Sequence, residues 1–192
     1  MYRELARDRP DAFLPDLASS LNNLGNRLSE LGRREEPVNA AQEAVEIYRR
    51  LAKDRPDAFL PYVATSLNNL ANSLRELGRR EEALKVAQKA VDIRRRLAKD
   101  RPDAFLPDLA RSFGTLGTCL AADARLREAV EAFAEGVRTL APAFERLPQA
   151  FASLMGALVS EYLTHVKELG ESPDMELLAS ILAKFEEIKG SE

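Results

Sequence analysis

The sequence predicts an all-α fold, a solenoid of about four helix-turn-helix repeats. The heptapeptide Arg-Pro-Asp-Ala-Phe-Leu-Pro begins at Arg9, Arg55 and Arg101, a step of 46 residues each time. Residues 9–54 and 55–100 agree at 33 of their 46 positions, and a fixed period of this length is typical of repeat architectures. Leucines recur at helical spacing within each unit, and no segment alternates with period two, so strands are not expected.

The period divides the chain into repeats. We expect repeat 1 at 9–54, repeat 2 at 55–100, repeat 3 at 101–146 and a degenerate C-terminal repeat or cap at 147–192. Residues 1–8 match the end of a repeat, since Tyr2-Arg-Glu-Leu-Ala-Arg-Asp8 resembles Tyr48-Arg-Arg-Leu-Ala-Lys-Asp54, and are expected to be the tail of a preceding repeat helix. One unit cannot bury its apolar face alone, so the repeats are expected to form one continuous solenoid domain.

The first helix of repeat 1 carries an apolar stripe at i, i+3, i+4 and i+7 spacing. Its members are Leu17, Leu21, Leu24, Leu28 and Leu31. Gly32 suits the left-handed conformation at a helix C-terminus, so the helix is expected to end there. Pro10 and Pro15 leave two possible starts: a short turn before a main helix from near Leu14, or Pro10 at the first helical position. We favour the short turn.

The second helix of repeat 1 follows a turn at 33–36, and its acidic first turn suits the helix dipole. Its expected buried stripe is Val38, Ala41, Ala44, Val45, Tyr48 and Leu51. The helix is expected to stop before Pro56, because a residue that precedes proline disfavours helical angles.

These residues resemble the tetratricopeptide repeat, whose pattern combines large residues, a Leu-Gly pair, a turn glycine and spaced small residues. Unit 1 matches at Leu21, Leu24-Gly25, Leu28, Gly32, Ala41 and Ala44, unit 2 at Leu67, Leu70-Ala71, Leu74, Gly78, Ala83, Ala87 and Ala90, and unit 3 at Phe113, Leu116-Gly117, Leu120, Ala129, Phe133 and Gly136. The usual period is about 34 residues, so both helices are longer here. The resemblance implies a right-handed α-α superhelix that binds proteins, with the first helices on its concave face.

Polar residues map to that concave face. The expected partner-binding groove comprises Asn22, Asn26, Thr65, Asn68, Asn69, Asn72, Arg75, Arg111, Thr115 and Thr118, with Ser19, Asn23 and Ser29 on the same face. Asparagine is a mediocre helix former, whereas its carboxamide offers a donor and an acceptor to a peptide backbone. The alternative is that these asparagines are solvated positions copied by duplication.

The family's carboxylate clamp, which grips the C-terminus of a bound peptide, is incomplete here. The resemblance places its asparagines at Asn26 and Asn69 and one basic residue at Arg111, but its other basic positions fall on Asn22 and Thr115. Binding of a C-terminal tail is therefore not expected.

Composition argues against several classes of function. Acidic and basic residues nearly balance, 31 against 28, whereas nucleic-acid binders usually concentrate basic charge on one face. The run Arg94-Arg95-Arg96 lies among acidic neighbours and is interpreted as a solvated face. No apolar run approaches the ~18 residues of a membrane span, and no secretory signal is recognised, so a cytoplasmic protein is expected.

No catalytic or metal site is predicted. The single cysteine, Cys119, excludes an intramolecular disulfide and a multi-cysteine metal site, and it is expected to be a small buried residue. His165 is the only histidine; we see no acid or cysteine at ligand spacing, and one histidine cannot build a metal site. We expect no enzyme activity and no cofactor.

Two hypotheses for function follow. The first is a scaffold that binds a partner peptide or helix in its concave groove. The alternative is self-assembly of a larger multidomain protein: the face of Leu21, Leu24 and Leu28 lacks a preceding repeat, so another copy could cover it and form a homo-oligomer. The apolar segment 133–163, with Phe144, Met155 and Leu158, either closes the core as a terminal unit, which we favour, or forms a docking patch.

Overall fold

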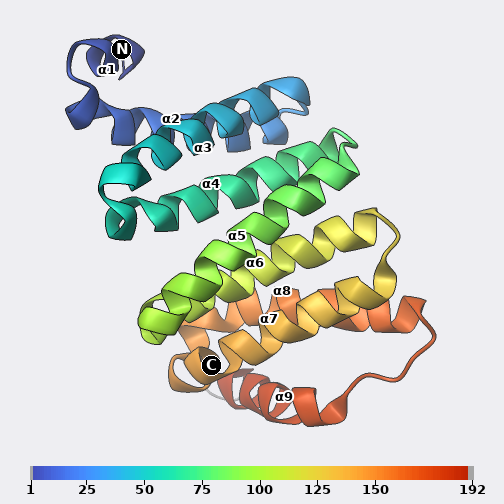
Figure 1. Cartoon of the computed structure of the whole chain (residues 1–192). Helices are drawn as coiled ribbons and strands as arrows, with labels where there is room; N and C mark the ends of the chain where they lie inside the picture. Colours follow the sequence, from blue (N-terminus) through green and yellow to red (C-terminus); the bar gives the residue numbers. More distant parts are fainter. Residues whose placement is uncertain (1, 190–192) are drawn as a thin grey trace. The chain divides into compact units, whose positions relative to one another are not determined.

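The computed structural model describes residues 2–189, and within them the ordered elements are all α-helices (Figure 1). The helices are α1 (Tyr2–Asp8), α2 (Pro10–Glu30), α3 (Glu35–Asp54), α4 (Pro56–Glu76), α5 (Arg80–Asp100), α6 (Pro102–Ala122), α7 (Leu126–Arg146), α8 (Pro148–Glu168) and α9 (Met175–Lys189). The all-α class and the helix-turn-helix repeat are confirmed. None of the described helices combines the length and the apolar character that crossing a membrane requires.

The first helix of each repeat begins at a proline, which corrects the expected short turn. Pro10, Pro56, Pro102 and Pro148 each occupy the start of a helix, and Pro15 lies inside α2. Proline is favoured at this position because its fixed φ suits the helix and its missing N–H would have no intrahelical partner. Arg9 before it is non-helical, with φ −138° and ψ 76°. The helix therefore starts at the first proline and continues through the second.

Glycines end the first helices, as predicted for Gly32. Gly32, Gly78 and Gly170 have φ of 73°, 83° and 68°, the left-handed region that glycine enters without steric cost. The Gly32 N–H donates to the carbonyl of Ser29 at 2.9 Å, and that of Arg33 to Leu28 at 2.9 Å, which satisfies carbonyls at the helix end. In repeat 3 the equivalent residue is Ala124, with φ 59°.

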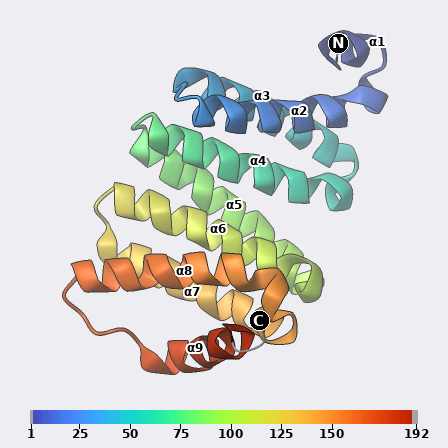
Figure 2. The same cartoon turned by 180° about the vertical axis from the view of Figure 1, so that it is seen from behind.

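The chain divides into two compact units, residues 1–93 and 94–192, with the division inside α5. In unit 1, α3 packs against both α2 and α4, and the first helices α2 and α4 lie side by side (Figure 2). The predicted stripe of α3 is buried throughout, with Ala44 at 0% and Tyr48 at 3% exposure.

In unit 2, α7 packs against α6 and α8, and α9 covers α7 and α8. Phe133, Phe144 and Met155 are fully buried, and the rings of Phe144 and Phe185 lie 4.9 Å apart. Most of the apolar segment thus closes the core of this unit, as favoured from the sequence, whereas Leu147 and Leu163 within it remain 60% and 36% exposed.

The five leucines expected to form the buried face of the first helix of repeat 1 are only partly buried in α2, which corrects that prediction. Leu17 and Leu21 are buried, but Leu24 is 49% and Leu31 is 76% exposed. In repeat 2 the equivalent of Leu24, Leu70, is only 7% exposed. Helix α4 follows a complete repeat, whereas α2 follows only the seven-residue α1.

Candidate partner-binding surface

Six asparagines of unit 1 lie on two neighbouring first helices, α2 and α4. The side-chain Nδ2 of Asn22 donates a hydrogen bond to Oγ of Ser66 at 2.7 Å. This bond ties the two helices together across their polar face. The spacing is sequence-encoded, because the same Ser-Leu-Asn-Asn motif occurs at 20–23 and again at 66–69.

Four asparagines are left facing outward on this surface. Asn23 and Asn26 are exposed on α2, and Asn69 and Asn72 are half-buried on α4. Within the described part of the chain, their side-chain amides make no hydrogen bond to another residue. We call these four residues the asparagine face. Each carboxamide can offer both donors and an acceptor to a bound molecule.

A shallow depression of about 400 Å³ lies at the α2 side of the asparagine face. Its lining residues are Asn23, Asn26, Arg27 and Glu30. Arg27 and Glu30 form an exposed ion pair with an N–O distance of 2.8 Å, and this carboxylate raises the pKa of Arg27. Polar and charged groups of both signs therefore border the asparagines.

Two of the expected groove residues lie elsewhere. Asn68 is only 7% exposed, and Asn22 is half-buried and bonded to Ser66. Consecutive helical residues point about 100° apart, so the first asparagine of each Asn-Asn pair turns inward and the second turns outward. Asn68 is thus removed from the accessible groove, and Asn23 joins it.

The other expected residues of α4 flank the asparagine face. Thr65 is exposed and donates its hydroxyl to the carbonyl of Pro61 at 3.2 Å. The side chain of Arg75 is one third exposed and lies 3.7 Å from the carboxylate of Glu76. Thr65 is therefore open to solvent, whereas the Nε of Arg75 is buried.

Unit 2 carries the remaining expected residues on α6. Arg111 is exposed, whereas Thr115 and Thr118 are half-buried. Their hydroxyls donate to backbone carbonyls, Thr115 to that of Arg111 at 3.3 Å and Thr118 to that of Thr115 at 2.9 Å. Arg111 is therefore the polar group of this set whose donors are the most accessible.

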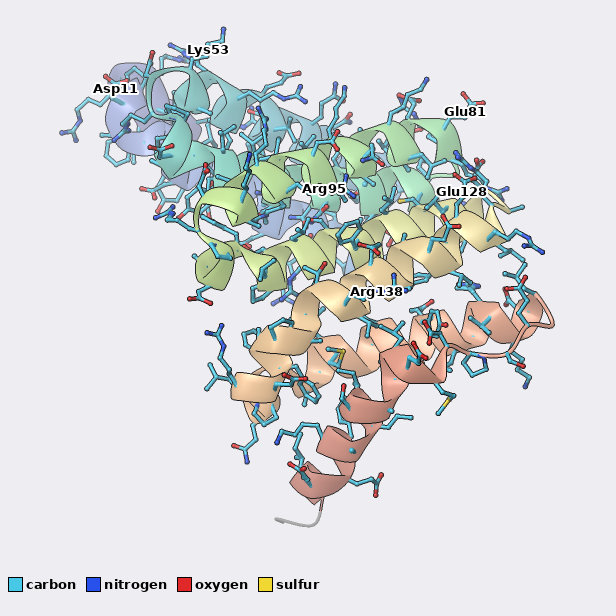
Figure 3. The ribbon with its side chains drawn as sticks, turned by 60° about the horizontal axis from the view of Figure 1, so that its bottom comes forward. Asp11, Lys53, Glu81, Arg95, Glu128 and Arg138 are labelled. Atoms are coloured by element: carbon cyan, nitrogen blue, oxygen red, sulfur yellow. The ribbon has the colours of Figure 1, made fainter. Side chains whose placement is uncertain are left out.

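Arg94 is buried, which corrects the solvated face expected for the Arg94-Arg95-Arg96 run. Its side chain is 4% exposed and its Nη1 lies 2.8 Å from a carboxylate oxygen of Asp108. Burial lowers the pKa of Arg94, and the Asp108 carboxylate opposes that shift. Arg95 and Arg96 are exposed, and Figure 3 shows Arg95 on α5.

His165 is flanked by two carboxylates, contrary to the expectation that no acid lies nearby. Its Nδ1 is 2.8 Å from Glu168 and its Nε2 is 3.5 Å from Glu161. These acids lie three and four residues away, so the helix brings them to the same face as the histidine. The ring also stacks on Phe133 with centroids 5.5 Å apart. No group of three metal-binding side chains occurs among the described residues.

Arginine–glutamate pairs recur at the start of α3, α5 and α7. They join Arg33 to Glu36, Arg79 to Glu82 and Arg125 to Glu128, and Figure 3 shows Glu128 in the first turn of α7. Hydrogen bonds from the arginines lower the pKa of Glu82 and of Glu128. All of these side chains are exposed, so they contribute little to stability.

Comparison with known proteins agrees with this geometry. Residues 17–57 and 63–103 match the tetratricopeptide repeat family, so these two segments are tetratricopeptide repeats, as recognised from the sequence. Among curated proteins, no relative of this protein is found by sequence.

Solved structures share the fold. The protein is similar to the nearly identical TPR-like repeats of a Podosopora anserina protein described as a kinesin light chain, with a TM-score of 0.60, 23% identity, and coverage of 88% of this sequence and 75% of that one. A single-substitution variant of that protein gives the same TM-score and identity, with 74% of its length covered. At this identity the likeness establishes the fold alone.

Proposed function

We propose that this protein is an interaction scaffold that binds an extended peptide segment of a partner along the asparagine face. Tetratricopeptide repeats generally mediate protein–protein interaction and are typically non-catalytic. The observation that carries the finer proposal is the set of four outward carboxamides that no described residue engages. Their low helix propensity is not offset by a side-chain hydrogen bond to any of residues 2–189.

The chemistry of these carboxamides suits a peptide backbone. Each residue of an extended peptide presents one N–H and one C=O group, and an asparagine side chain can bond either. Asn23 and Asn26 lie on one helix and Asn69 and Asn72 on its neighbour, so a peptide that runs across α2 and α4 meets amides from both. Backbone recognition of this kind tolerates many partner sequences, and Arg27 and Glu30 add charges that select among them.

The proposal is tested by selecting ligands and mapping their binding. Peptides enriched from a random library displayed on phage are measured by fluorescence anisotropy against the wild-type protein and Asn26→Ala/Asn69→Ala. Each net hydrogen bond contributes about 0.5–1.5 kcal/mol, so a loss of affinity on the order of tenfold is expected. Asn39→Ala/Gln42→Ala is the matched control, because both residues are exposed on α3.

Two outcomes would overturn the assignment: equal binding by the Asn26→Ala/Asn69→Ala variant, or an equal loss in the α3 control. Helicity of every variant is checked by circular dichroism. Arg111→Ala, measured separately, reports whether α6 of unit 2 also contacts the selected peptides.

Self-assembly is the second candidate function, and the exposure of Leu24 and Leu31 favours it. Two solvent-facing leucines close together in sequence could be covered by another copy. Light scattering after size exclusion, over a hundredfold range of concentration, decides the matter. A mass of about 21 kDa throughout would exclude assembly, whereas a mass that rises with concentration would support it.

A further inference from the structure

An exposed tyrosine extends the asparagine face toward the start of α4. Tyr62 precedes Thr65 by three residues and Asn69 by seven, a spacing that places these side chains on one side of the helix. Its side chain is 51% exposed. Among the aromatic residues of 2–189, Tyr62 alone is exposed, whereas the others are buried or half-buried. A bound molecule on the asparagine face can therefore reach its ring.

The Tyr62 ring is held in place by the core of unit 1. It stacks on the ring of Tyr48, with centroids 5.3 Å apart and an interplanar angle of 18°, and its centroid lies 6.3 Å from that of Phe59. Tyr48 and Phe59 are buried, so they fix the orientation of Tyr62 from one side and leave its other side to solvent. A ring held in this way offers a flat contact surface with little loss of conformational entropy on binding.

The carboxylate of Asp16 reaches the same place from α2. Asp16 is the equivalent of Tyr62, 46 residues earlier, and it is exposed. Both lie near the hydroxyl of Tyr48, which donates to the carbonyl of Pro15 at 3.3 Å. Burial raises the pKa of that hydroxyl most; electrostatic interactions with Tyr62 and Asp16 raise it further, and a hydrogen bond with Ser19 lowers it. An aromatic ring and a carboxylate thus lie close together where α2 and α4 meet.

No cation among residues 2–189 pairs with either group. None of the ion pairs of this part of the chain includes Asp16, and none of its cation–ring contacts includes Tyr62. The cation that most closely precedes Tyr62 in the sequence, Arg55, lies over the ring of Phe59 instead, 4.8 Å from its centroid. The ring and the carboxylate are therefore both open to a cation from another molecule.

Unit 2 shows how a cation satisfies such a pair of groups. The residue equivalent to Tyr62 is Asp108, and its carboxylate lies 2.8 Å from the guanidinium of Arg94. The same guanidinium lies 6.0 Å from the centroid of the Phe105 ring, so one cation contacts a carboxylate and an aromatic ring together. In unit 1 the equivalent of Arg94 is Tyr48. Unit 1 thus offers the carboxylate and the ring without the cation.

We propose that Asp16 and Tyr62 form a subsite for an arginine side chain of the peptide that the asparagine face binds. This inference rests on the proposed function and names the chemistry of its ligand. A guanidinium is planar and weakly hydrated, so it stacks on an aromatic face while its N–H groups donate to a carboxylate. The subsite therefore selects peptides by charge, whereas the asparagines bond the peptide backbone.

The spacing along α4 sets where the arginine lies in the peptide. Asn69 follows Tyr62 by seven residues, which is about 10 Å along a helix that rises ~1.5 Å per residue. An extended peptide covers this distance with about three residues, at roughly 3.3–3.6 Å each. The arginine is therefore expected about three residues from the peptide group that bonds Asn69.

The test compares two synthetic peptides in nuclear magnetic resonance titrations of the full-length protein. One is a short peptide of glycine and serine with a single central arginine, and the other carries citrulline, the neutral isostere of arginine, in its place. Shifts of the backbone amide signals around Tyr62 give a dissociation constant for each peptide, and the ratio of the two constants measures the preference for the cation. Exposed cation–ring and ion-pair contacts are each modest, so the arginine peptide should bind roughly fivefold more tightly.

Four variants, each checked for helicity by circular dichroism, assign this preference to the subsite. Asp16→Asn should bring the ratio close to unity, and Tyr62→Leu should lower it, because leucine covers Tyr48 but offers no aromatic face. Tyr62→Phe keeps the ring and should keep the preference. Asp11→Asn is the matched control for the change of charge, because Asp11 is exposed on α2 but, five positions before Asp16, points to another side of the helix.

Equal affinity of the two peptides for the wild type, absence of any shift around Tyr62, or an unchanged ratio in Asp16→Asn would each overturn the proposal. Asn26→Ala/Asn69→Ala should weaken the binding of both peptides alike and leave their ratio unchanged. If that variant binds both peptides like the wild type while Asp16→Asn loses the preference, the asparagine face is rejected and the arginine subsite stands. The reverse result rejects the arginine subsite alone.

Discussion

The ring of Phe133 leaves room only for glycine at position 117 of α6, so replacement of Gly117 by alanine should destabilise unit 2. A Cβ at this position would lie 2.6 Å from Cε1 and 2.7 Å from Cζ of Phe133. The equivalents of Phe133 in repeats 1 and 2 are Ala41 and Ala87. Repeat 3 therefore places a phenylalanine ring where the other two repeats have alanine, and the glycine leaves room for it.

Two opposing effects set the size of the change. Alanine is favoured over glycine in a helix interior by about 1 kcal/mol, whereas forcing an extra carbon into a packed core costs about 1–3 kcal/mol. Gly156 of α8 in the same unit is the matched control, because its Cβ would meet Phe185 at an ordinary 3.8 Å. Gly156→Ala should keep the helix gain, so the two variants should differ by about 1–3 kcal/mol in the free energy of unfolding.

The assay is urea unfolding followed by circular dichroism at 222 nm, with a double-mutant cycle to locate the strain. Phe133→Leu should relieve the clash, so Gly117→Ala should destabilise less in that background than in the wild type. Equal effects of Gly117→Ala and Gly156→Ala, or no coupling between Gly117 and Phe133, would refute the reasoning.

Further predictions concern a cap, a core leucine and an ion pair. Ala124→Gly should raise the free energy of unfolding by about 0.5–1 kcal/mol, because it removes the strain of an alanine at φ 59°; an unchanged or lower free energy of unfolding would contradict this. Leu70→Ala should lower the free energy of unfolding by about 2–5 kcal/mol in the same assay, whereas Leu24→Ala at an exposed position should lower it far less. Similar losses for the two variants would contradict the observation that Leu70 is buried and Leu24 is exposed. Asp108→Tyr should destabilise the protein, because it leaves Arg94 buried without its carboxylate. The double variant Arg94→Tyr/Asp108→Tyr should recover stability by forming the stack that Tyr48 and Tyr62 form in unit 1. Thermal melts that show no recovery would contradict the equivalence of the Arg94–Asp108 and Tyr48–Tyr62 pairs.

The sequence predicted the helices well because its signals are local and repeated. The 46-residue period fixed which helices are equivalent, and glycine at Gly32 marked a helix end through a conformation that few residues adopt. The start of α2 was predicted wrongly because two prolines, Pro10 and Pro15, both satisfy simple rules for helix boundaries. The structure shows that the first proline starts the helix and the second is tolerated inside it.

The candidate surface was predicted only in outline, because its details depend on neighbours that lie far away in sequence. Asn22 and Asn23 are chemically identical and point in different directions from one helix, and the position of α4 decides that the first of them faces Ser66. Leu24 and Leu70 occupy equivalent places in closely similar motifs, yet their exposure differs with the helix that precedes them. His165 could have been placed between two carboxylates from the sequence, since Glu161 and Glu168 stand at helical spacing on either side.

The most direct test of the asparagine face is a nuclear magnetic resonance titration of the protein with one of the phage-selected peptides. The side-chain amide signals of asparagine report hydrogen bonding at each carboxamide separately. Binding along α2 and α4 predicts that the signals of Asn26 and Asn69 shift with increasing peptide while that of Asn39 on α3 stays unchanged. Shifts confined to residues outside the asparagine face, with the signals of Asn26 and Asn69 unmoved, would contradict it.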